Sequence, residues 1–315
     1  MLEVSITLLV LSAYLLRATF KKINTLPTNN PTAMLGRSGC TDGNDEEYIV
    51  CIGDSITQGT VSAAWVPMLH RLFGSDNRYS SLTMVNAGVN SELAYNVSKR
   101  IDTVLSLNPK IVILLIGSND IKAVANPKLG VAAKKKMNLP SIPTEQFFQD
   151  NMLLLLQLLT HNLSDDAKIY VCSIPPLGED LHSEYNTIHV SRANAFIQQL
   201  VAKTNKTNTM SIKYVPVFEA FECTMGLHDQ YCEDTYGKKT SPLPFKNWTL
   251  SKTIFTALLY HTFGLSWNLI GYYLYGNFLT TEGLHMNDRG AEVIAKTIAA
   301  TIQSRSVNEV KYSFM

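Results

Sequence analysis

One serine, Ser55, has a sequence context in which a reactive hydroxyl is expected. Ser55 lies in the stretch Gly53-Asp54-Ser55-Ile56-Thr57-Gln58-Gly59, which directly follows the apolar run Tyr48–Ile52. A serine hydroxyl is a weak nucleophile unless a neighbouring base takes its proton and donors stabilise the negative charge that develops on the attacked group. If the apolar run is a buried strand, Ser55 falls at its carboxyl end, where open α/β sheets place their chemistry.

Three further segments supply groups of the kinds that such a serine needs. His285 is the candidate base, and the asparagine of Gly117-Ser118-Asn119-Asp120 is a candidate hydrogen-bond donor. The segments are Val85-Asn86-Ala87-Gly88-Val89-Asn90-Ser91, Gly117–Asp120 and Glu282-Gly283-Leu284-His285-Met286-Asn287-Asp288-Arg289-Gly290. Taken with the Ser55 stretch, and in this order, they resemble the four sequence blocks of the SGNH, or GDSL-type, esterase and lipase superfamily from about Tyr48 to Ser304.

The resemblance implies a role for each matching residue. Ser55 would be the nucleophile and His285 the base, while the Ser55 amide, the Gly88 amide and the Asn119 side chain would form the oxyanion hole. The last block of the family usually reads Asp-x-x-His, whereas this chain has Glu282 at the acid position. A glutamate can also orient the imidazole and stabilise the imidazolium, so we expect Glu282 to complete the triad, with Asp288 as the rival partner.

The elements around these segments predict how they are brought together. Five short apolar runs are candidate strands, and amphipathic stretches between them are candidate helices. This alternation predicts a three-layer α/β/α fold with a five-stranded parallel sheet, which is flavodoxin-like as in SGNH hydrolases. The candidate strands are Tyr48–Ile52, Leu82–Asn86, Ile111–Ile116, Ile169–Ser173 and Ile212–Val217; the candidate helices are Ala64–Phe73, Ala94–Leu105, Thr144–His161, Ser191–Thr204 and Ala291–Ser304.

An apolar insertion over residues 250–281 precedes the histidine segment. From Thr253 to Thr281 it contains no Asp, Glu, Lys or Arg. A single membrane crossing here would put Ser55 and His285 on opposite sides of the bilayer, and two crossings need about 40 residues. We therefore expect a buried helix pair, an apolar lid or a helix in the membrane interface, with aromatic residues such as Phe263 and Trp267 lining an acyl site.

The amino-terminal region predicts targeting rather than catalysis. Residues 4–16 form an uncharged apolar run of the length of a signal-peptide core, so residues 1–21 are interpreted as a signal peptide or membrane anchor. Residues 22–47 read as a linker, residues 48–304 as the catalytic domain and residues 305–315 as a tail. The secretory pathway is the expected location, but the basic residues after the run leave a cytoplasm-facing anchor open.

Composition excludes several classes of function. The net charge of +1 gives no electrostatic reason to expect nucleic acid as a partner. The five cysteines form no C-x-x-C pair, so no metal is expected, and the proposed chemistry requires no cofactor. Cys223 and Cys232 flank a polar stretch read as a loop, and they could pair in an oxidising compartment.

The function expected from the sequence is hydrolysis of carboxylic esters through an acyl-enzyme. The apolar insertion next to the histidine favours lipid or long acyl esters as substrates and a membrane surface as a possible partner. Two alternatives stay open within the fold, a carbohydrate O-acyl esterase and an acyltransferase. A third is a catalytically inactive binding protein that retains the fold.

Overall fold

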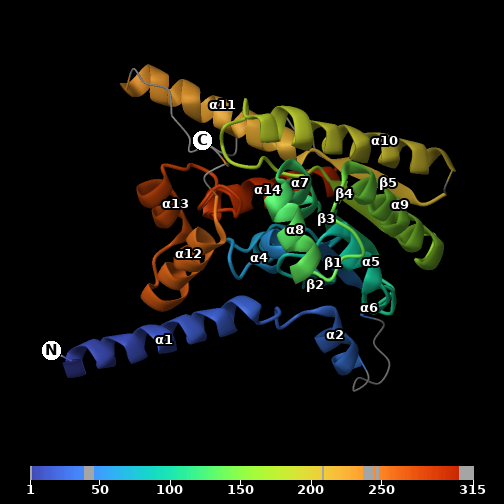
Figure 1. Ribbon diagram of the computed structural model, residues 1–315. Helices are drawn as coiled ribbons and strands as arrows, with labels where there is room; N and C mark the ends of the chain where they lie inside the picture. Colours follow the sequence, from blue (N-terminus) through green and yellow to red (C-terminus); the bar gives the residue numbers. More distant parts are fainter. Residues whose placement is uncertain (1, 39–45, 208, 237–244, 246–247, 305–315) are drawn as a thin grey trace.

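The computed structural model describes residues 2–38, 46–207, 209–236, 245 and 248–304. Five parallel strands form one sheet in the order β2-β1-β3-β4-β5 (Figure 1). The strands are β1 (Tyr48–Gly53), β2 (Thr83–Gly88), β3 (Ile111–Leu115), β4 (Lys168–Cys172) and β5 (Ser211–Val215). All five begin and end within two residues of the predicted runs. The predicted α/β fold with a five-stranded parallel sheet is confirmed.

The sheet separates two apolar cores because alternate strand residues face opposite sides. Val50 and Ile52 of β1 face one core, and Ile49 and Cys51 face the other. The first core is covered by α5 (Ala94–Lys99), α9 (Glu145–Asn162) and α10 (Ser191–Thr207). The second is covered by α4 (Trp65–Phe73), α11 (Val217–Tyr236) and α14 (Asp288–Ile302). This is the predicted three-layer arrangement.

The remaining elements surround the carboxyl edge of the sheet or connect the layers. The four-residue helix α3 (Ser55–Gln58) follows β1, and α6 (Asp102–Leu105) follows α5. Helices α7 (Ser118–Ala125) and α8 (Pro127–Lys136) follow β3, and a π-helical turn, η1 (Tyr185–Val190), leads into α10.

The region before β1 is more ordered than predicted. Helix α1 spans Leu2–Asn24, past the predicted boundary at residue 21, and α2 (Pro31–Ser38) lies inside the predicted linker. The carboxyl end of α1 is tied to the domain because the Ile23 carbonyl accepts hydrogen bonds from Gln58, Thr60 and Asn90. Residues 22–38 are therefore not a free linker, while the rest of α1 projects from the body (Figure 1).

The apolar insertion forms two helices, α12 (Leu250–Phe263) and α13 (Trp267–Tyr275). Gly264 ends α12 in the left-handed conformation, with φ of 70°. Helix α12 packs against α1, and α13 packs against α14. A helix pair is present as expected, but it is not fully buried, because Phe255, Phe263 and Tyr273 are exposed. No helix among the described residues has the length and apolar character needed to cross a membrane.

The disulfide between Cys223 and Cys232, which the sequence left open, is not formed. Both residues lie on α11, which the sequence analysis read as a loop, and both are free thiols. Nine residues of helix separate their Cα atoms by roughly 13 Å along the axis, whereas a disulfide requires less than about 7 Å.

Candidate active site

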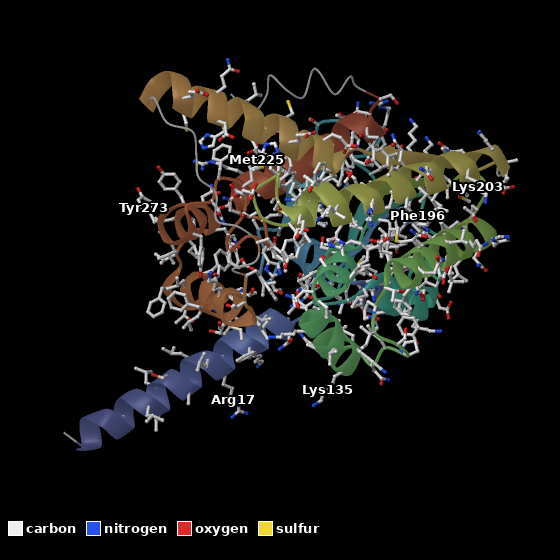
Figure 2. The ribbon with its side chains drawn as sticks, turned by 45° about the horizontal axis from the view of Figure 1, so that its top comes forward. Arg17, Lys135, Phe196, Lys203, Met225 and Tyr273 are labelled. Carbon is white, nitrogen blue, oxygen red and sulfur yellow. The ribbon has the colours of Figure 1, made fainter. Side chains whose placement is uncertain are left out.

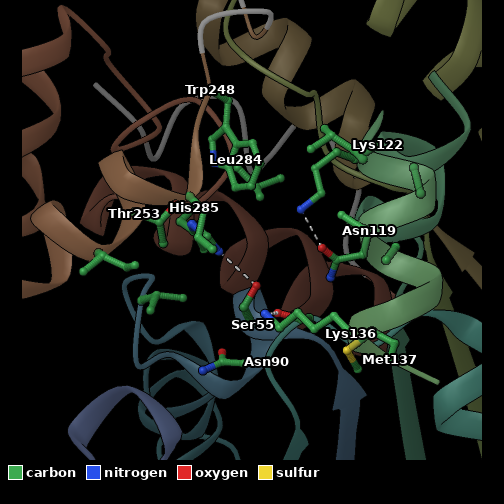
Figure 3. A pocket seen from close by; sticks show the side chains of 18 of the residues that line it. Ser55, Asn90, Asn119, Lys122, Lys136, Met137, Trp248, Thr253, Leu284 and His285 are labelled. Atoms are coloured by element: carbon green, nitrogen blue, oxygen red, sulfur yellow. Dashed lines mark hydrogen bonds between the residues drawn. The ribbon is translucent and has the colours of Figure 1, made fainter. Parts of the chain in front are cut away.

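Ser55 and His285 meet at the carboxyl edge of the sheet. The Ser55 Oγ lies 3.0 Å from the His285 Nε2, although 230 residues separate them (Figure 3). Both side chains are buried. Ser55 begins α3 directly after β1, and Asp54 caps this short helix by accepting a hydrogen bond from the Ile56 amide at 2.9 Å. The strand and cap thus fix the serine hydroxyl against the imidazole.

Glu282 occupies the position expected of the acid. Its carboxylate pairs with the opposite ring nitrogen, Nδ1 of His285, and so fixes which nitrogen faces Ser55. Thr281 and Thr253 also donate to this carboxylate, the latter at 2.8 Å. Asp288 begins α14 and accepts a hydrogen bond from the Asn268 amide instead.

The charge of Glu282 is stabilised despite its burial. Burial raises the pKa of this carboxyl, but the nearby His285 and the hydrogen bonds from His285, Thr281 and Thr253 outweigh it and lower the pKa to about 2. Because this lies below the ordinary value of 4.5, the associated stabilisation is complete above about pH 4.5 and is lost as the pH falls toward 2. Glu282 is an anion at neutral pH.

A second buried glutamate positions the loop that precedes this acid. The two carboxylate oxygens of Glu179 accept hydrogen bonds from three consecutive amides, those of Phe278, Leu279 and Thr280, at 2.6–2.7 Å. The Thr280 hydroxyl donates to it as well. Glu179 could not be predicted from sequence, since nothing in its local pattern connects it to a loop about 100 residues later.

The structure does not place Gly88 where the oxyanion hole was expected. Its amide already donates to the Oδ1 of Asn86 at 2.9 Å, and the residue does not line the pocket at Ser55. A Cβ at this position would lie 2.2 Å from the Gln58 backbone nitrogen. Gly88 is therefore needed for the close approach of β2 to α3.

Ser91, three residues further on, offers a better-placed donor. It lines the same pocket as Ser55 and adopts a left-handed conformation with φ of 67°, which is uncommon for a residue other than glycine. Within the described part of the chain, the amides of Ser55 and Ser91 donate no hydrogen bond. The unusual backbone conformation could not be read from the residue type.

Asn119 lies beside these amides, and Lys122 determines which way its side-chain amide faces. The Lys122 ammonium donates to the Asn119 Oδ1 at 2.9 Å (Figure 3). Because an ammonium has no acceptor, the Nδ2 must face the other way, where it lies 3.1 Å from the Glu92 carbonyl and 3.3 Å from the Asp54 carboxylate. The second of these contacts is long, so an Nδ2 proton can be redirected to a developing oxyanion.

A pocket of about 730 Å³ opens above Ser55 and His285. One wall is apolar and comes from α1 and the start of α12, with Phe20, Ile23, Leu250 and Ile254. The opposite wall comes from α7 and α8 and presents Lys122 and Lys136, together with Ala123, Leu129 and Met137. The two walls thus differ in charge.

Two aromatic residues of the insertion do not line this pocket as predicted. Trp267 is 2% exposed and stacks on Tyr260, with ring centroids 4.0 Å apart. Phe263 lies at the end of α12 and is exposed. The first turns of α12 border the pocket instead, because that helix runs away from Ser55 toward its carboxyl end.

The described residues contain no cluster of three or more His, Cys, Asp or Glu side chains that could hold a metal ion.

Comparisons with known proteins place the chain in a family. The sequence profile of the GDSL-like lipase/acylhydrolase family matches residues 51–293, whereas a search of curated proteins finds no match. Similar solved structures include the acetyl xylan esterase AlAXEase, with 17% identity, a TM-score of 0.52, and coverage of 81% of this chain and 99% of the other. The acetylxylan esterase Axe2 from Geobacillus stearothermophilus has 14% identity, a TM-score of 0.52, and coverage of 81% and 94%.

At these identities the structural matches show a shared fold, while the profile match covers most of the chain. Its range includes the Ser55, Asn119 and His285 segments that the sequence analysis singled out. The chain belongs to the GDSL-like lipase/acylhydrolase family, and its general activity is ester hydrolysis.

Proposed function

We propose that this protein hydrolyses carboxylic esters with Ser55 as the nucleophile, through an acyl-enzyme. The observation that supports the proposal is the continuous chain from the Ser55 Oγ through the His285 ring to the Glu282 carboxylate at the base of the pocket. A serine hydroxyl, an imidazole and an orienting carboxylate in this order form the arrangement that activates serine in unrelated hydrolases.

The proposed mechanism gives each group a task. The Ser55 Oγ attacks the ester carbonyl and its proton passes to the His285 Nε2, while Glu282 stabilises the resulting imidazolium. The carbonyl oxygen gains negative charge, and the amides of Ser55 and Ser91 and the Asn119 Nδ2 donate to it. His285 then protonates the leaving alcohol, and a water activated by the same imidazole releases the acid.

The pocket favours an ester with an apolar acyl group over a carbohydrate ester. Phe20, Ile23, Leu250 and Ile254 border one side of it, and they offer no hydrogen bonds to sugar hydroxyl groups. The intact Ser55–His285–Glu282 arrangement argues against an inactive binding protein. Transfer of the acyl group to an alcohol uses the same residues, and product analysis distinguishes it from hydrolysis.

The decisive experiment combines labelling with turnover. A fluorophosphonate probe should label the wild-type protein, and Ser55→Ala should lose both labelling and hydrolysis of 4-nitrophenyl esters, by roughly 10⁶-fold in kcat. The change should alter the free energy of unfolding by no more than about 1 kcal/mol, because it removes no core volume. Labelling that persists in Ser55→Ala would assign the nucleophile to another residue.

We also propose that the ester substrate is drawn from a membrane surface. Exposed apolar side chains of α1 lie on the projecting helix, including Leu9, which is 72% exposed, and Tyr14. Arg17, Lys21 and Lys22 follow this apolar part, and Arg17 and Lys135 project from the same side of the molecule (Figure 2). An apolar helix followed by basic residues is suited to binding at an anionic bilayer surface.

Flotation with vesicles of phosphatidylcholine and phosphatidylserine tests this membrane proposal. Leu9→Ser together with Tyr14→Ser should reduce the vesicle-bound fraction, because two apolar side chains leave the acyl region. Leu154→Ser, an exposed apolar position on α9, is the control and should leave binding unchanged. Equal flotation of all three proteins would contradict a role for α1.

A further inference from the structure

Two lysine side chains line the pocket that contains the reacting serine. Lys122 comes from α7 and Lys136 from the last residue of α8. Lys122 is partly buried, and Lys136 stands at the exposed rim. The Lys136 ammonium donates to the Ser91 Oγ at 2.8 Å, and the Lys122 ammonium donates to Asn119. Each lysine is thus held beside a residue of the proposed oxyanion hole.

Neither ammonium forms an ion pair within the described part of the chain. The Lys122 Nζ is compensated by the neutral Asn119 Oδ1 at 2.9 Å and by the face of the Trp248 ring, whose centroid lies 4.3 Å away. Asp54 and Glu282 influence Lys122 electrostatically, but they are engaged in hydrogen bonds with Ile56 and His285. Desolvating a lysine without a paired carboxylate is costly, so this arrangement requires an explanation.

A ligand anion would supply the missing charge. Both lysines are on the same side of the pocket, opposite the apolar wall, and in the close view the Lys136 side chain extends from α8 toward Ser55 (Figure 3). Ammonium groups bind phosphate and carboxylate as point charges with three donors each. The apolar wall cannot serve this purpose, and an acyl chain would not use the lysines.

We infer that Lys122 and Lys136 form an anion subsite, so that the preferred substrate is an acyl ester with a phosphate or carboxylate close to the ester group. The acyl chain lies along Phe20, Ile23, Leu250 and Ile254, and the anion lies against the two ammonium groups. The inference rests on the proposed ester hydrolysis at Ser55. It adds the substrate class, an anionic amphiphile.

Burial is consistent with a function for Lys122 that depends on charge. Burial lowers the pKa of this ammonium to about 8, with Asp54 and Glu282 acting in the opposite direction and Lys136 in the same one. A bound anion would favour the charged form and raise that pKa.

The test compares two esters that differ by one phosphate, 1-lauroylglycerol and 1-lauroylglycerol 3-phosphate, by measuring released laurate. The wild-type protein should prefer the phosphorylated ester in kcat/KM, and Lys122→Met or Lys136→Met should reduce that preference by roughly 10-fold or more. The ratio is the readout, because any damage transmitted through Asn119 or Ser91 affects both esters alike. Lys135→Met, on the same helix but outside the pocket lining, is the matched control and should keep the wild-type ratio.

A binding measurement separates failure of the subsite from failure of the proposed activity. The Ser55→Ala protein is titrated with dodecyl phosphate while intrinsic tryptophan fluorescence is followed, to which Trp248 contributes as the ring that faces Lys122. Saturable binding that Lys122→Met weakens by about 10-fold supports the subsite even if neither ester is turned over. Binding of inorganic phosphate as tight as that of dodecyl phosphate would indicate a free-phosphate site and overturn the assignment to an amphiphile.

An unchanged ratio and unchanged dodecyl phosphate binding in both lysine variants would overturn the subsite, while hydrolysis by the wild-type protein would leave the Ser55 assignment intact. Hydrolysis that persists in Ser55→Ala would overturn the proposed function instead.

Discussion

The two sides of the pocket differ in what they contribute to Ser55. On the side of α12, Thr253 and Trp248 donate to Glu282, which in turn orients His285. On the side of α7 and α8, Lys122 and Lys136 hold Asn119 and Ser91. In the proposed mechanism the first side moves a proton, and the second receives negative charge. Trp248 contacts both sides, since its Nε1 donates to Glu282 and its ring faces Lys122, so each test below uses a measurement specific to one side.

The largest effect is expected on the proton-transfer side. Glu282→Gln should lower kcat by roughly 10²–10⁴-fold, because a neutral amide neither stabilises the imidazolium nor fixes the ring tautomer. Steady-state kinetics with 4-nitrophenyl butyrate provide the measurement. Glu282→Asp is the matched control and should retain part of the activity. Full activity of Glu282→Gln would mean that another group orients His285.

The next largest effect on kcat is expected on the side that carries Asn119. Asn119→Ala should lower kcat by roughly 10²–10³-fold with a smaller change in KM, because its amide is expected to act mainly in the transition state. Fluorophosphonate labelling at saturating probe gives a second readout of the serine that does not depend on ester turnover. A change confined to KM would assign Asn119 to ground-state binding.

A smaller effect is expected in how the preference for the phosphorylated ester depends on pH. Lys122 has a folded-state pKa of about 8, below the ordinary 10.5. It therefore loses its proton as the pH rises through about 8. The phosphate of the ester is already ionised above about pH 7. The preference in kcat/KM for the phosphorylated ester should therefore decline by roughly 10-fold between about pH 7 and about pH 9.5. Effects of pH on the chemical step common to both esters cancel in the ratio. A preference that is constant over this range would show that Lys122 does not set it.

The smallest effect is expected on the apolar wall. Ile254→Asn should reduce the gain in kcat/KM per added acyl carbon, since a methylene buried against an apolar wall contributes about 0.8 kcal/mol. Esters from butyrate to laurate give the slope. Phe255→Asn, at the next position but exposed and outside the pocket lining, should leave it unchanged. A similar loss at every chain length would indicate structural damage rather than a lost acyl contact.

Some of this organisation was determined by sequence alone. The five short apolar runs, bounded by turn-forming residues and alternating with amphipathic stretches, predicted a parallel sheet covered by helices, because this alternation is typical of α/β folds. Ser55, Asn119, Glu282 and His285 were singled out because their segments, in this order, resemble the sequence blocks of SGNH hydrolases and lie next to predicted strand ends or the final helix.

Tertiary structure decided the rest, because it depends on contacts between segments that are remote in sequence. Whether Gly88 or Ser91 offers a free amide depends on Asn86 and on the backbone conformation at Ser91. The lysines of α7 and α8 became pocket residues only through the packing of those helices, which no periodic pattern had predicted. The carboxyl end of α1 borders the pocket because the Ile23 carbonyl accepts hydrogen bonds from three side chains of the domain. A local sequence pattern specifies which residues can react, but the alignment of a donor with an acceptor 30 or 200 residues away is fixed only when the whole chain packs.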